Sequence, residues 1–254
     1  MSGPSWDPAC YLACAGERER PFHELVARVG VADPSFVVDL GCGPGTATVS
    51  LLTRWPAARV VGVDSAAAML ARADEVADPP RLSFVLSDIR DWEPPEPPDV
   101  VIANAVLQWV PGHEALIGRL AARLPPAGAL AFQVPGNFER PTHTLLRQLA
   151  PPGLLRDAPV LEPAGYLRLL QAAGLAADVW ETTYLHVLTG PDPVLEWVRS
   201  TALRPVLDAL DAGAAAELEA EYAARLRAAY PPDGEGRTVL PFRRIFAVGH
   251  RPAG

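Results

Sequence analysis

Three glycines and two aspartates early in the sequence have the types and spacing of a ligand-binding loop. Gly41, Gly43 and Gly45 alternate within the run VVDLGCGPG, which also contains the acid Asp39. Glycine lacks a Cβ, so such a loop can approach a ligand closely and adopt the positive φ angles of a tight turn. A second acid, Asp64, ends a later apolar stretch, where a carboxylate can accept both hydroxyls of a ribose. The spacing therefore indicates a site for an adenosine-containing ligand.

The elements that must position these residues are two strand-and-helix pairs. The run FVVDL predicts a strand over Phe36–Leu40, followed by a helix over Thr46–Trp55. A second strand is expected over Val60–Val63, and Ser65 is a candidate N-cap for a helix over Ala66–Ala77. In an open α/β sheet the ligand lies at the carboxyl ends of the strands, which is where the glycines and Asp64 fall.

The rest of the chain continues the alternation of strands and helices. Further strands are expected over Leu82–Leu86, Val100–Ala103, Gly128–Val134, Ala176–Leu188 and Thr238–Val248, and further helices over Pro21–Arg28, His113–Leu124, Leu145–Leu149 and Pro163–Ala173. This order predicts an α/β fold, a doubly wound sheet with mostly parallel strands. We expect residues 1–254 to form one domain, with an N-terminal arm (1–30) and a helical cap inserted at about 189–232, before the last strand. The arm either packs on the sheet edge or forms a lid over the pocket.

The glycine pattern disfavours a dinucleotide loop, and the absence of lysine excludes a Walker-type phosphate loop. It reads GxGxG, whereas the dinucleotide fingerprint requires GxGxxG or GxGxxA. A Walker-type phosphate loop requires a lysine, and the chain has none.

Composition restricts the partners. The chain has 254 residues, of which 49% are hydrophobic, and a formal net charge of −8. The negative charge argues against a nucleic-acid partner, because phosphate binding needs a basic face. An anionic substrate would have to be attracted by a local cluster of arginine, histidine or helix N-termini, because the overall field repels it.

The cysteines do not form a metal-ligand pattern. Cys10 and Cys14 could offer two ligands, but no second cysteine pair or paired histidines complete a tetrahedral site. Together with Cys42 they indicate buried or free thiols in a reducing cytoplasm. The sequence also lacks the pattern of a signal peptide or a membrane span. We therefore expect a cytoplasmic protein without a metal, for which a monomer is plausible.

The sequence resembles the class I S-adenosylmethionine (SAM)-dependent methyltransferases, and within them the trans-aconitate 2-methyltransferase family, over nearly its whole length. The stretches that carry the resemblance are WDPACYL (6–12), ERERP (17–21), DLGCGPG (39–45), RWPAAR (54–59), DIRDW (88–92), ANAVLQWVPGH (103–113), PTH (141–143), TTYLH (182–186) and LRP (203–205). The glycine motif is common to the whole class, whereas the stretches near both ends are more specific.

The resemblance implies that Asp39 lies near the amino group of the cofactor and that the end of the fourth strand lies beneath the sulfonium. Asp88 can accept from the exocyclic amine of adenine, or it simply caps a turn. Met69 contacts the adenine or belongs to the core. The cofactor-binding residues expected are Asp39, Gly41, Cys42, Gly43, Gly45, Asp64, Ser65, Met69, Asp88, Ile89, Asn104, Ala105 and Gln108.

The family reaction implies methyl transfer to a carboxylate of trans-aconitate, giving the monomethyl ester and S-adenosylhomocysteine. A carboxylate is already ionised at pH 7, so the reaction needs no dedicated catalytic residue. From their places on the arm, the cap and the strand ends, we expect the substrate to be bound by Tyr11, Arg18, Trp109, Asn137, His143, His186, Arg204 and Arg244.

Two alternatives remain open at this stage. One is a methyltransferase for another small carboxylic acid or a natural-product intermediate, because fold does not fix substrate. The other is a SAM-binding module without catalysis.

Overall fold

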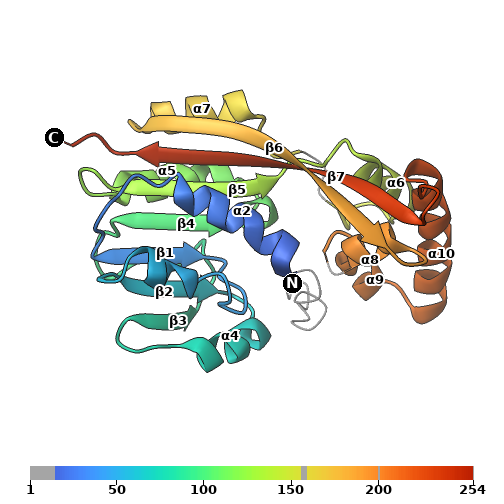
Figure 1. Cartoon of the computed structure of the whole chain (residues 1–254), viewed down its shortest axis with the longest axis horizontal. Coiled ribbons are helices and arrows are strands. Elements are labelled where there is room, and N and C mark those ends of the chain that lie inside the picture. Colours follow the sequence, from blue (N-terminus) through green and yellow to red (C-terminus); the bar gives the residue numbers. More distant parts are fainter. Residues whose placement is uncertain (1–14, 156–158, 200, 254) are drawn as a thin grey trace. The chain divides into compact units, whose positions relative to one another are not determined.

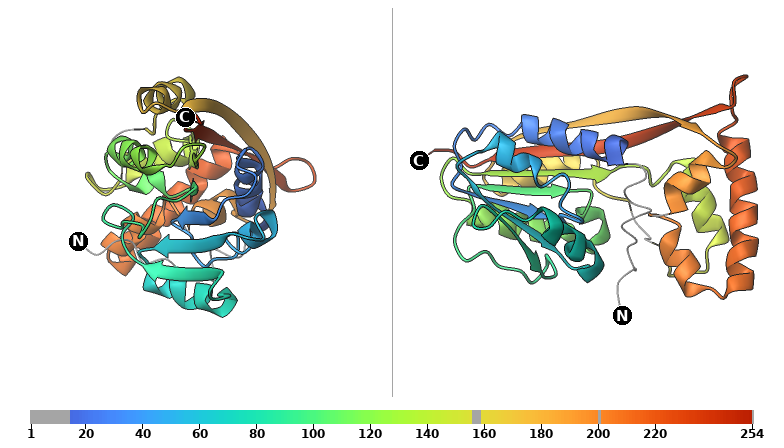
Figure 2. Two further views of the ribbon diagram at one scale, coloured as in Figure 1. Left: turned by 90° about the vertical axis from the view of Figure 1, so that its left-hand side faces the viewer. Right: turned by 60° about the horizontal axis from the view of Figure 1, so that its bottom comes forward.

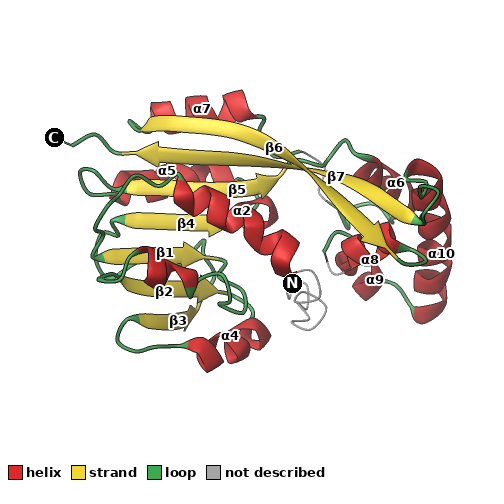
Figure 3. Cartoon of the chain, in the orientation of Figure 1, coloured by secondary structure: helices red, strands yellow, loops and turns green. Residues whose placement is uncertain are grey.

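A computed structural model describes residues 15–155, 159–199 and 201–253, with side chains from Glu19 onward. Within these residues, seven strands form one sheet in the order β3-β2-β1-β4-β5-β7-β6 (Figure 1). The strands are β1 (Phe36–Leu40), β2 (Arg59–Asp64), β3 (Leu82–Leu86), β4 (Val100–Asn104), β5 (Ala129–Pro135), β6 (Ala176–Thr189) and β7 (Arg237–His250). Strands β3, β2, β1, β4 and β5 are parallel neighbours, and Figure 3 shows β7 running in the opposite direction. The sheet is therefore mostly parallel, as expected.

The central strands are buried because their sequences are almost continuous runs of β-branched residues. All five residues of β1 are buried, and Val38 lies in register with Val61 of β2 and Val101 of β4. Such runs are typical of parallel strands that are covered on both faces. In the same register the buried Asp39 lies beside Gly62 and Ile102, so a carboxyl group stands in the middle of an apolar sheet.

Helices cover both faces of the sheet; for example, α2 and α5 lie on opposite faces (Figure 2). The described helices are α2 (Ala15–Ala27), α3 (Ser50–Arg54), α4 (Ala67–Ala73), η1 (Asp74–Val76), η2 (Leu107–Trp109), α5 (His113–Arg123), α6 (Pro141–Leu149), α7 (Pro163–Ala172), α8 (Pro193–Arg199), α9 (Arg204–Ala209) and α10 (Ala212–Ala229).

Three expected helix boundaries are wrong. Helix α2 begins at Ala15 rather than Pro21, because the charged residues before the proline are good helix formers and continue the helix. Helix α3 begins at Ser50 rather than Thr46, since residues 46–49 form turns that follow the left-handed Gly45. Helix α6 starts at Pro141, with the proline in the first turn, where its missing N–H costs nothing.

Ser65 is not the N-cap of α4. The N-cap is Ala66, whose backbone N–H donates to Oδ1 of Asp64 at 2.8 Å. The acid two residues earlier therefore takes the place of the serine as the hydrogen-bond acceptor at this turn.

The described residues divide into two compact units. The sheet unit contains residues 15–135, 161–182 and 245–253, and the helical unit contains residues 136–160 and 183–244 where these are described. The long strands β6 and β7 contribute residues to both units. The helical unit has its own apolar core, which includes Trp197, Leu203, Tyr222, Leu226 and Leu240. Helices α8, α9 and α10 fall in the helical stretch that the sequence predicts between the last two strands.

Candidate functional site

Asp39 is a buried acid near the end of β1. Its side chain is 2% exposed, and Oδ2 accepts a hydrogen bond from Thr48 Oγ1 at 2.6 Å. Burial raises the pKa of Asp39 to about 7, and the negative charge of Asp64 adds to the rise, while the Thr48 hydrogen bond opposes it. An ionised carboxylate at this position would be stabilised by a bound cation, because charge in a low-dielectric site interacts strongly with its partner.

The glycine loop has the backbone conformation that its sequence indicates. Gly41, Gly43 and Gly45 all have positive φ angles, of 72°, 55° and 77°. A Cβ on Gly41 would lie 2.4 Å from the Val106 side chain, whereas a Cβ on Gly43 would meet no atom within 4 Å. Gly41 is therefore required for packing, and Gly43 leaves its backbone open to a ligand.

Asp64 ties the glycine loop to the end of β2. Its Oδ2 accepts from the backbone N–H of Gly43 at 2.9 Å, and its Oδ1 accepts from Ala66 at 2.8 Å. The backbone N–H of Gly41 donates to the Val63 carbonyl at 2.7 Å. Each carboxylate oxygen retains further acceptor capacity, so the same side chain can shape the loop and accept ribose hydroxyls.

The end of β4 combines a buried amide with a strained turn. Asn104 Oδ1 is buried and has no hydrogen-bond partner among the described residues. Ala105 follows with a φ of 54°, an unfavourable angle for a residue with a Cβ. Gln108 Nε2 donates to the Ala105 carbonyl at 2.6 Å and stabilises this turn. A buried acceptor and backbone strain at a strand end both indicate a ligand site.

The other expected cofactor residues follow β1, β2 or β3 or lie in α4. Asp88 follows β3 and is bound by the Arg90 side chain, with an Nη2–Oδ2 distance of 2.6 Å; these hydrogen bonds lower the pKa of Asp88. Met69 is buried in α4, and Ile89 is buried after β3. Ser65 is exposed. The Cys42 side chain packs with Leu70, Ala73 and Phe84, and burial raises the pKa of its thiol. Cys42 can therefore contribute to a ligand site only through its backbone.

Two expected substrate residues meet in an aromatic cluster of the helical unit. His186 on β6 is 7% exposed, and its ring centroid lies 4.4 Å from that of Trp197. Arg244 on β7 is 4% exposed, and its Cζ lies 4.9 Å from the centroid of Phe242. The same Phe242 contacts both His186 and Trp197. The structure thus brings a buried guanidinium and an imidazole into one cluster.

The remaining expected substrate residues are dispersed. Asn137 is buried, and its amide bonds both the N–H and the carbonyl of Arg243, so this side chain connects the end of β5 to β7. His143 Nδ1 lies 3.0 Å from Thr142 Oγ1, and Arg204 pairs with Asp208 one turn along α9. Trp109 in η2 is 38% exposed. Tyr11 and the side chain of Arg18 lie outside the described residues, as do Cys10 and Cys14.

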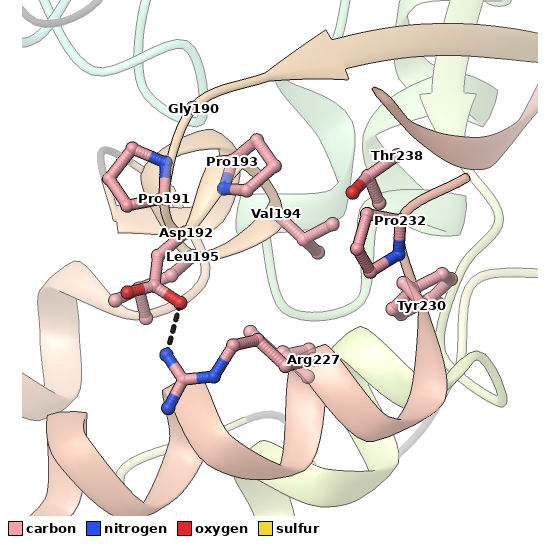
Figure 4. Close-up of a pocket in the computed structure, with 11 residues that line it drawn as sticks. Gly190, Pro191, Asp192, Pro193, Val194, Leu195, Arg227, Tyr230, Pro232 and Thr238 are labelled. Carbon is pink, nitrogen blue, oxygen red and sulfur yellow. Dashed lines mark hydrogen bonds and ion pairs between the residues drawn. The ribbon is translucent and has the colours of Figure 1, made fainter. Parts of the chain in front are cut away.

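A separate small pocket lies in the helical unit and contains none of the expected site residues (Figure 4). Its volume is about 60 Å³, and three prolines, Val194 and Leu195 contribute to its lining. Arg227 also lines the pocket and forms an ion pair with Asp192. Because this carboxylate balances its charge, Arg227 is a weak binding group for an anion.

No group of three or more His, Cys, Asp or Glu residues in the described part of the chain could hold a metal ion. No helix among these residues is long and apolar enough to cross a membrane.

Two polar residues near these strand ends do not belong to the set of site residues expected from the sequence. Thr48 is fully buried on Asp39, and Gln133 is fully buried on β5 in register with Asn104. The signal for Gln133 was its position beside a strand end, whereas Thr48 follows the loop in a segment that reads as ordinary helix.

Known proteins resemble this chain in sequence and in fold. A family model described as a methyltransferase domain matches residues 37–128. Trans-aconitate 2-methyltransferases of Streptomyces coelicolor, Methylobacterium nodulans and Mycobacterium tuberculosis are 53%, 47% and 46% identical to this chain. The alignments cover 100%, 97% and 96% of this chain and 89%, 98% and 95% of those proteins.

Solved structures share the fold at low sequence identity. The YcgJ protein of Bacillus subtilis has a TM-score of 0.65 at 13% identity, covering 92% of this chain and 99% of that one. A phosphoethanolamine N-methyltransferase of Haemonchus contortus, solved in complex with SAM, has a TM-score of 0.56 at 16% identity, covering 92% of this chain and 52% of that one.

The residues fit the cofactor of such enzymes. The buried carboxyl group on β1 can bind an ammonium group, and the open space at Gly43 allows a ligand to approach the backbone. The buried amide oxygen at the end of β4 can accept a hydrogen bond from a ligand. On these features and on identity over its full length, the chain belongs to the trans-aconitate 2-methyltransferase family of class I, SAM-dependent methyltransferases.

Proposed function

We propose that this protein transfers a methyl group from SAM to a carboxylate of trans-aconitate, giving the monomethyl ester and S-adenosylhomocysteine. The observation that carries the proposal is 53% sequence identity, over the whole chain, to a protein named trans-aconitate 2-methyltransferase. The alignment extends through the helical unit, which holds the expected substrate residues His186, Arg204 and Arg244, and not only through the glycine loop common to all class I enzymes.

We propose that the cofactor is held at the carboxyl ends of β1, β2, β3 and β4. Asp39 faces the ammonium of the amino-acid part, Asp64 accepts the ribose hydroxyls, and Asp88 accepts from the adenine amine. The other residues proposed for this site are Gly41, Cys42, Gly43, Gly45, Ser65, Met69, Ile89, Asn104, Ala105 and Gln108. The raised pKa of Asp39, the open space at Gly43 and the buried Asn104 Oδ1 support this assignment.

The chemistry needs alignment rather than a base. SAM supplies an electrophilic methyl group on a sulfonium, and the substrate carboxylate already carries its nucleophilic lone pair at pH 7. The protein must bring oxygen, methyl carbon and sulfur into line and exclude water, and such alignment can contribute about 7–11 kcal/mol to lowering the barrier. No side chain has to accept a proton.

We propose that arginine and histidine hold the carboxylates of the substrate that do not react. Arginine binds carboxylates bidentately, and all 22 basic residues counted as Lys or Arg in this chain are arginines. Arg244 and His186 are the strongest candidates, because both are buried in one aromatic cluster where a charge interaction is little screened. Arg204, His143, Asn137, Trp109, Tyr11 and Arg18 complete the proposed set.

A label on the transferred methyl group tests the proposed reaction. The protein is incubated with trans-aconitate and SAM that carries carbon-13 in its methyl group. We expect a labelled monomethyl ester that releases labelled methanol on alkaline hydrolysis. A labelled product that resists hydrolysis would contradict carboxyl methylation. If neither trans-aconitate nor any other small acid supplied in its place gives a labelled product, the result would instead support a SAM-binding module.

The wider setting follows from charge and thiol chemistry. We propose that the protein works in the cytoplasm, where the buried free thiol of Cys42 stays reduced, and that it acts on a small molecule rather than on nucleic acid. We also propose that residues 1–254 act as one enzyme, in which residues 1–30 form an N-terminal arm or lid and residues 189–232 a cap. A monomer is compatible with this proposal, and sedimentation of the purified protein would test it.

A further inference from the structure

Thr48 is a fully buried residue whose hydroxyl is directed at Asp39. Thr48 is 0% exposed, Asp39 is 2% exposed, and Thr48 Oγ1 donates to Asp39 Oδ2 at 2.6 Å. Among the described residues, no arginine or histidine forms an ion pair with Asp39. The hydroxyl is therefore the group in this region that stabilises the charged form of the carboxyl, since a donor to a carboxylate oxygen favours ionisation.

The turn after the glycine loop holds Thr48 in place at both ends. The backbone N–H of Val49 donates to Gly45 at 3.1 Å, and that of Leu51 donates to the Thr48 carbonyl at 3.0 Å. The α-helix begins only at Ser50, so the Thr48 hydroxyl need not bond a carbonyl of a preceding helical turn and can reach across to β1. A hydrogen bond to Oδ2 limits rotation of the Asp39 carboxyl and leaves Oδ1 able to accept from another donor.

We propose that Thr48 is a positioning residue for cofactor binding: its hydroxyl holds Oδ2 of Asp39 and stabilises the ionised carboxylate, so that Oδ1 can pair with the ammonium group at the amino-acid end of SAM. The inference rests on the cofactor of the family and not on trans-aconitate. A failure of the substrate proposal would therefore leave it standing, and its own failure would leave the substrate proposal intact.

The charges around Asp39 give this role a measurable consequence. Asp64 disfavours a second negative charge nearby, and the Cys42 thiol, whose own pKa is raised, stays neutral. In the free protein below about pH 7, Asp39 is therefore protonated, and binding of the ammonium must expel that proton. SAM affinity should fall about tenfold for each pH unit below this value, by linkage between proton and cofactor binding.

The experiment measures the dissociation constant of SAM between pH 5.5 and 8.5 for the wild type and Thr48→Val. Valine has the shape of threonine without the hydroxyl. Loss of a hydrogen bond to a charged group is expected to move the Asp39 titration upward by about one pH unit. The ratio of the two dissociation constants should then approach one at pH 8.5 and reach about tenfold at pH 6. Thr48→Ser should restore the wild-type profile.

Ser50→Ala is the matched control. Ser50 lies in the same turn, and its hydroxyl bonds the Ala47 carbonyl rather than Asp39. Its pH profile should follow the wild type. A ratio between Thr48→Val and wild type that is the same at every pH would mean that Thr48 has a purely structural role, and would overturn the proposal.

A second measurement does not depend on binding. Carbon-13 NMR of the Asp39 carboxyl in the free protein should give a pKa of about 7 in the wild type and a higher value without the hydroxyl. Should Thr48→Val not fold, Thr48→Ala takes its place in both measurements. An unshifted Asp39 titration in a folded variant that lacks the hydroxyl would refute the inference.

Discussion

At the scale of single residues, the site is organised around a carboxyl group that the empty protein does not readily ionise. Asp39 is the fourth residue of the buried strand β1 and lies in register with Gly62 of β2 and Ile102 of β4. Burial raises its pKa to about 7, so the ionised form costs stability in the ligand-free protein. A bound cation would offset this cost, which makes the acid a stability–function compromise.

The replacement Asp39→Asn should stabilise the ligand-free protein in a pH-dependent way. Below about pH 4 the carboxyl is protonated in both the folded and the unfolded chain, so the variant gains little. Between pH 4 and 7 the unfolded chain ionises first, and the folded wild type loses relative stability until its own carboxyl ionises. The stability gained by the variant should therefore grow up to pH 7 and then level off at a few kcal/mol in free energy of unfolding. The difference in melting temperature between the two proteins should follow the same course.

Thermal unfolding of both proteins from pH 4 to 8 checks this prediction. Other carboxyl groups titrate alike in the two proteins, so only the difference between them is interpreted. The same difference in melting temperature at pH 4 and pH 8 would contradict a raised pKa at Asp39.

The sequence predicts some of these residues and not others. Asp39, Asp64 and the glycines were predictable because strand, loop and acid follow each other in the chain. Thr48 was not, because only the fold brings a hydroxyl of the turn against a strand that lies earlier in the chain. The burial of Arg244 was likewise beyond the sequence, since an arginine on a strand is more often exposed.

At the scale of elements, one glycine of the loop is needed for packing and another leaves space for a ligand. Gly41 and Gly43 share positive φ angles, but only Gly41 is packed against another side chain, that of Val106. Two residues of one loop thus face different constraints, and substitution can separate them.

Alanine substitutions at these two glycines should have different effects. Each variant should lose about 1–2 kcal/mol of stability, because its alanine places a Cβ in the left-handed region. Gly41→Ala should lose about 1–3 kcal/mol more, because its Cβ would clash with Val106. Gly43→Ala should keep most of its stability but bind SAM at least about tenfold more weakly, because its methyl group fills the open space. Chemical denaturation and calorimetric titration measure the two effects, and unchanged SAM affinity in Gly43→Ala would exclude a close approach there.

Strands were predicted more accurately than helix starts for a physical reason. Short, mostly apolar runs such as FVVDL and LSFVL favour a strand, and β1 and β3 match their expected ranges. Helix starts depend on which group accepts the first free N–H donors. At α4 that group is Asp64, an acid that the sequence assigns to the ligand, and not the neighbouring Ser65.

At the scale of the whole molecule, the two units carry different parts of the proposed reaction. The residues proposed for the cofactor all lie in the sheet unit. Of those proposed for the substrate, Trp109 also lies there, whereas His143, His186, Arg204 and Arg244 lie in the helical unit. Variants in one unit should therefore change one binding step and leave the other nearly intact.

Asp64→Ala and Arg204→Ala test this division of roles. Asp64→Ala should weaken SAM binding, because the ribose loses its acceptor and the loop loses the bond to Gly43. Arg204→Ala should raise the KM for trans-aconitate about 10- to 100-fold, as expected for a lost charge-assisted hydrogen bond, and leave SAM binding unchanged. Calorimetry and steady-state kinetics separate the two effects.

Arg225→Ala serves as the control for Arg204. The two side chains are similarly exposed, at 38% and 39%, and each pairs with an acid one turn away on its own helix. Kinetics of Arg225→Ala should match the wild type. If Arg204→Ala behaves like this control, Arg204 is a surface charge and leaves the substrate set; normal SAM binding by Asp64→Ala would refute the ribose assignment.

The most direct test of the central claim compares kcat/KM for a panel of acids. Trans-aconitate, cis-aconitate, citrate, isocitrate and a malonyl thioester are each supplied with SAM, and products are identified by mass spectrometry. The account predicts a monomethyl ester formed chiefly from trans-aconitate. A higher kcat/KM for another acid would contradict the proposed substrate while leaving the methyltransferase fold and cofactor in place.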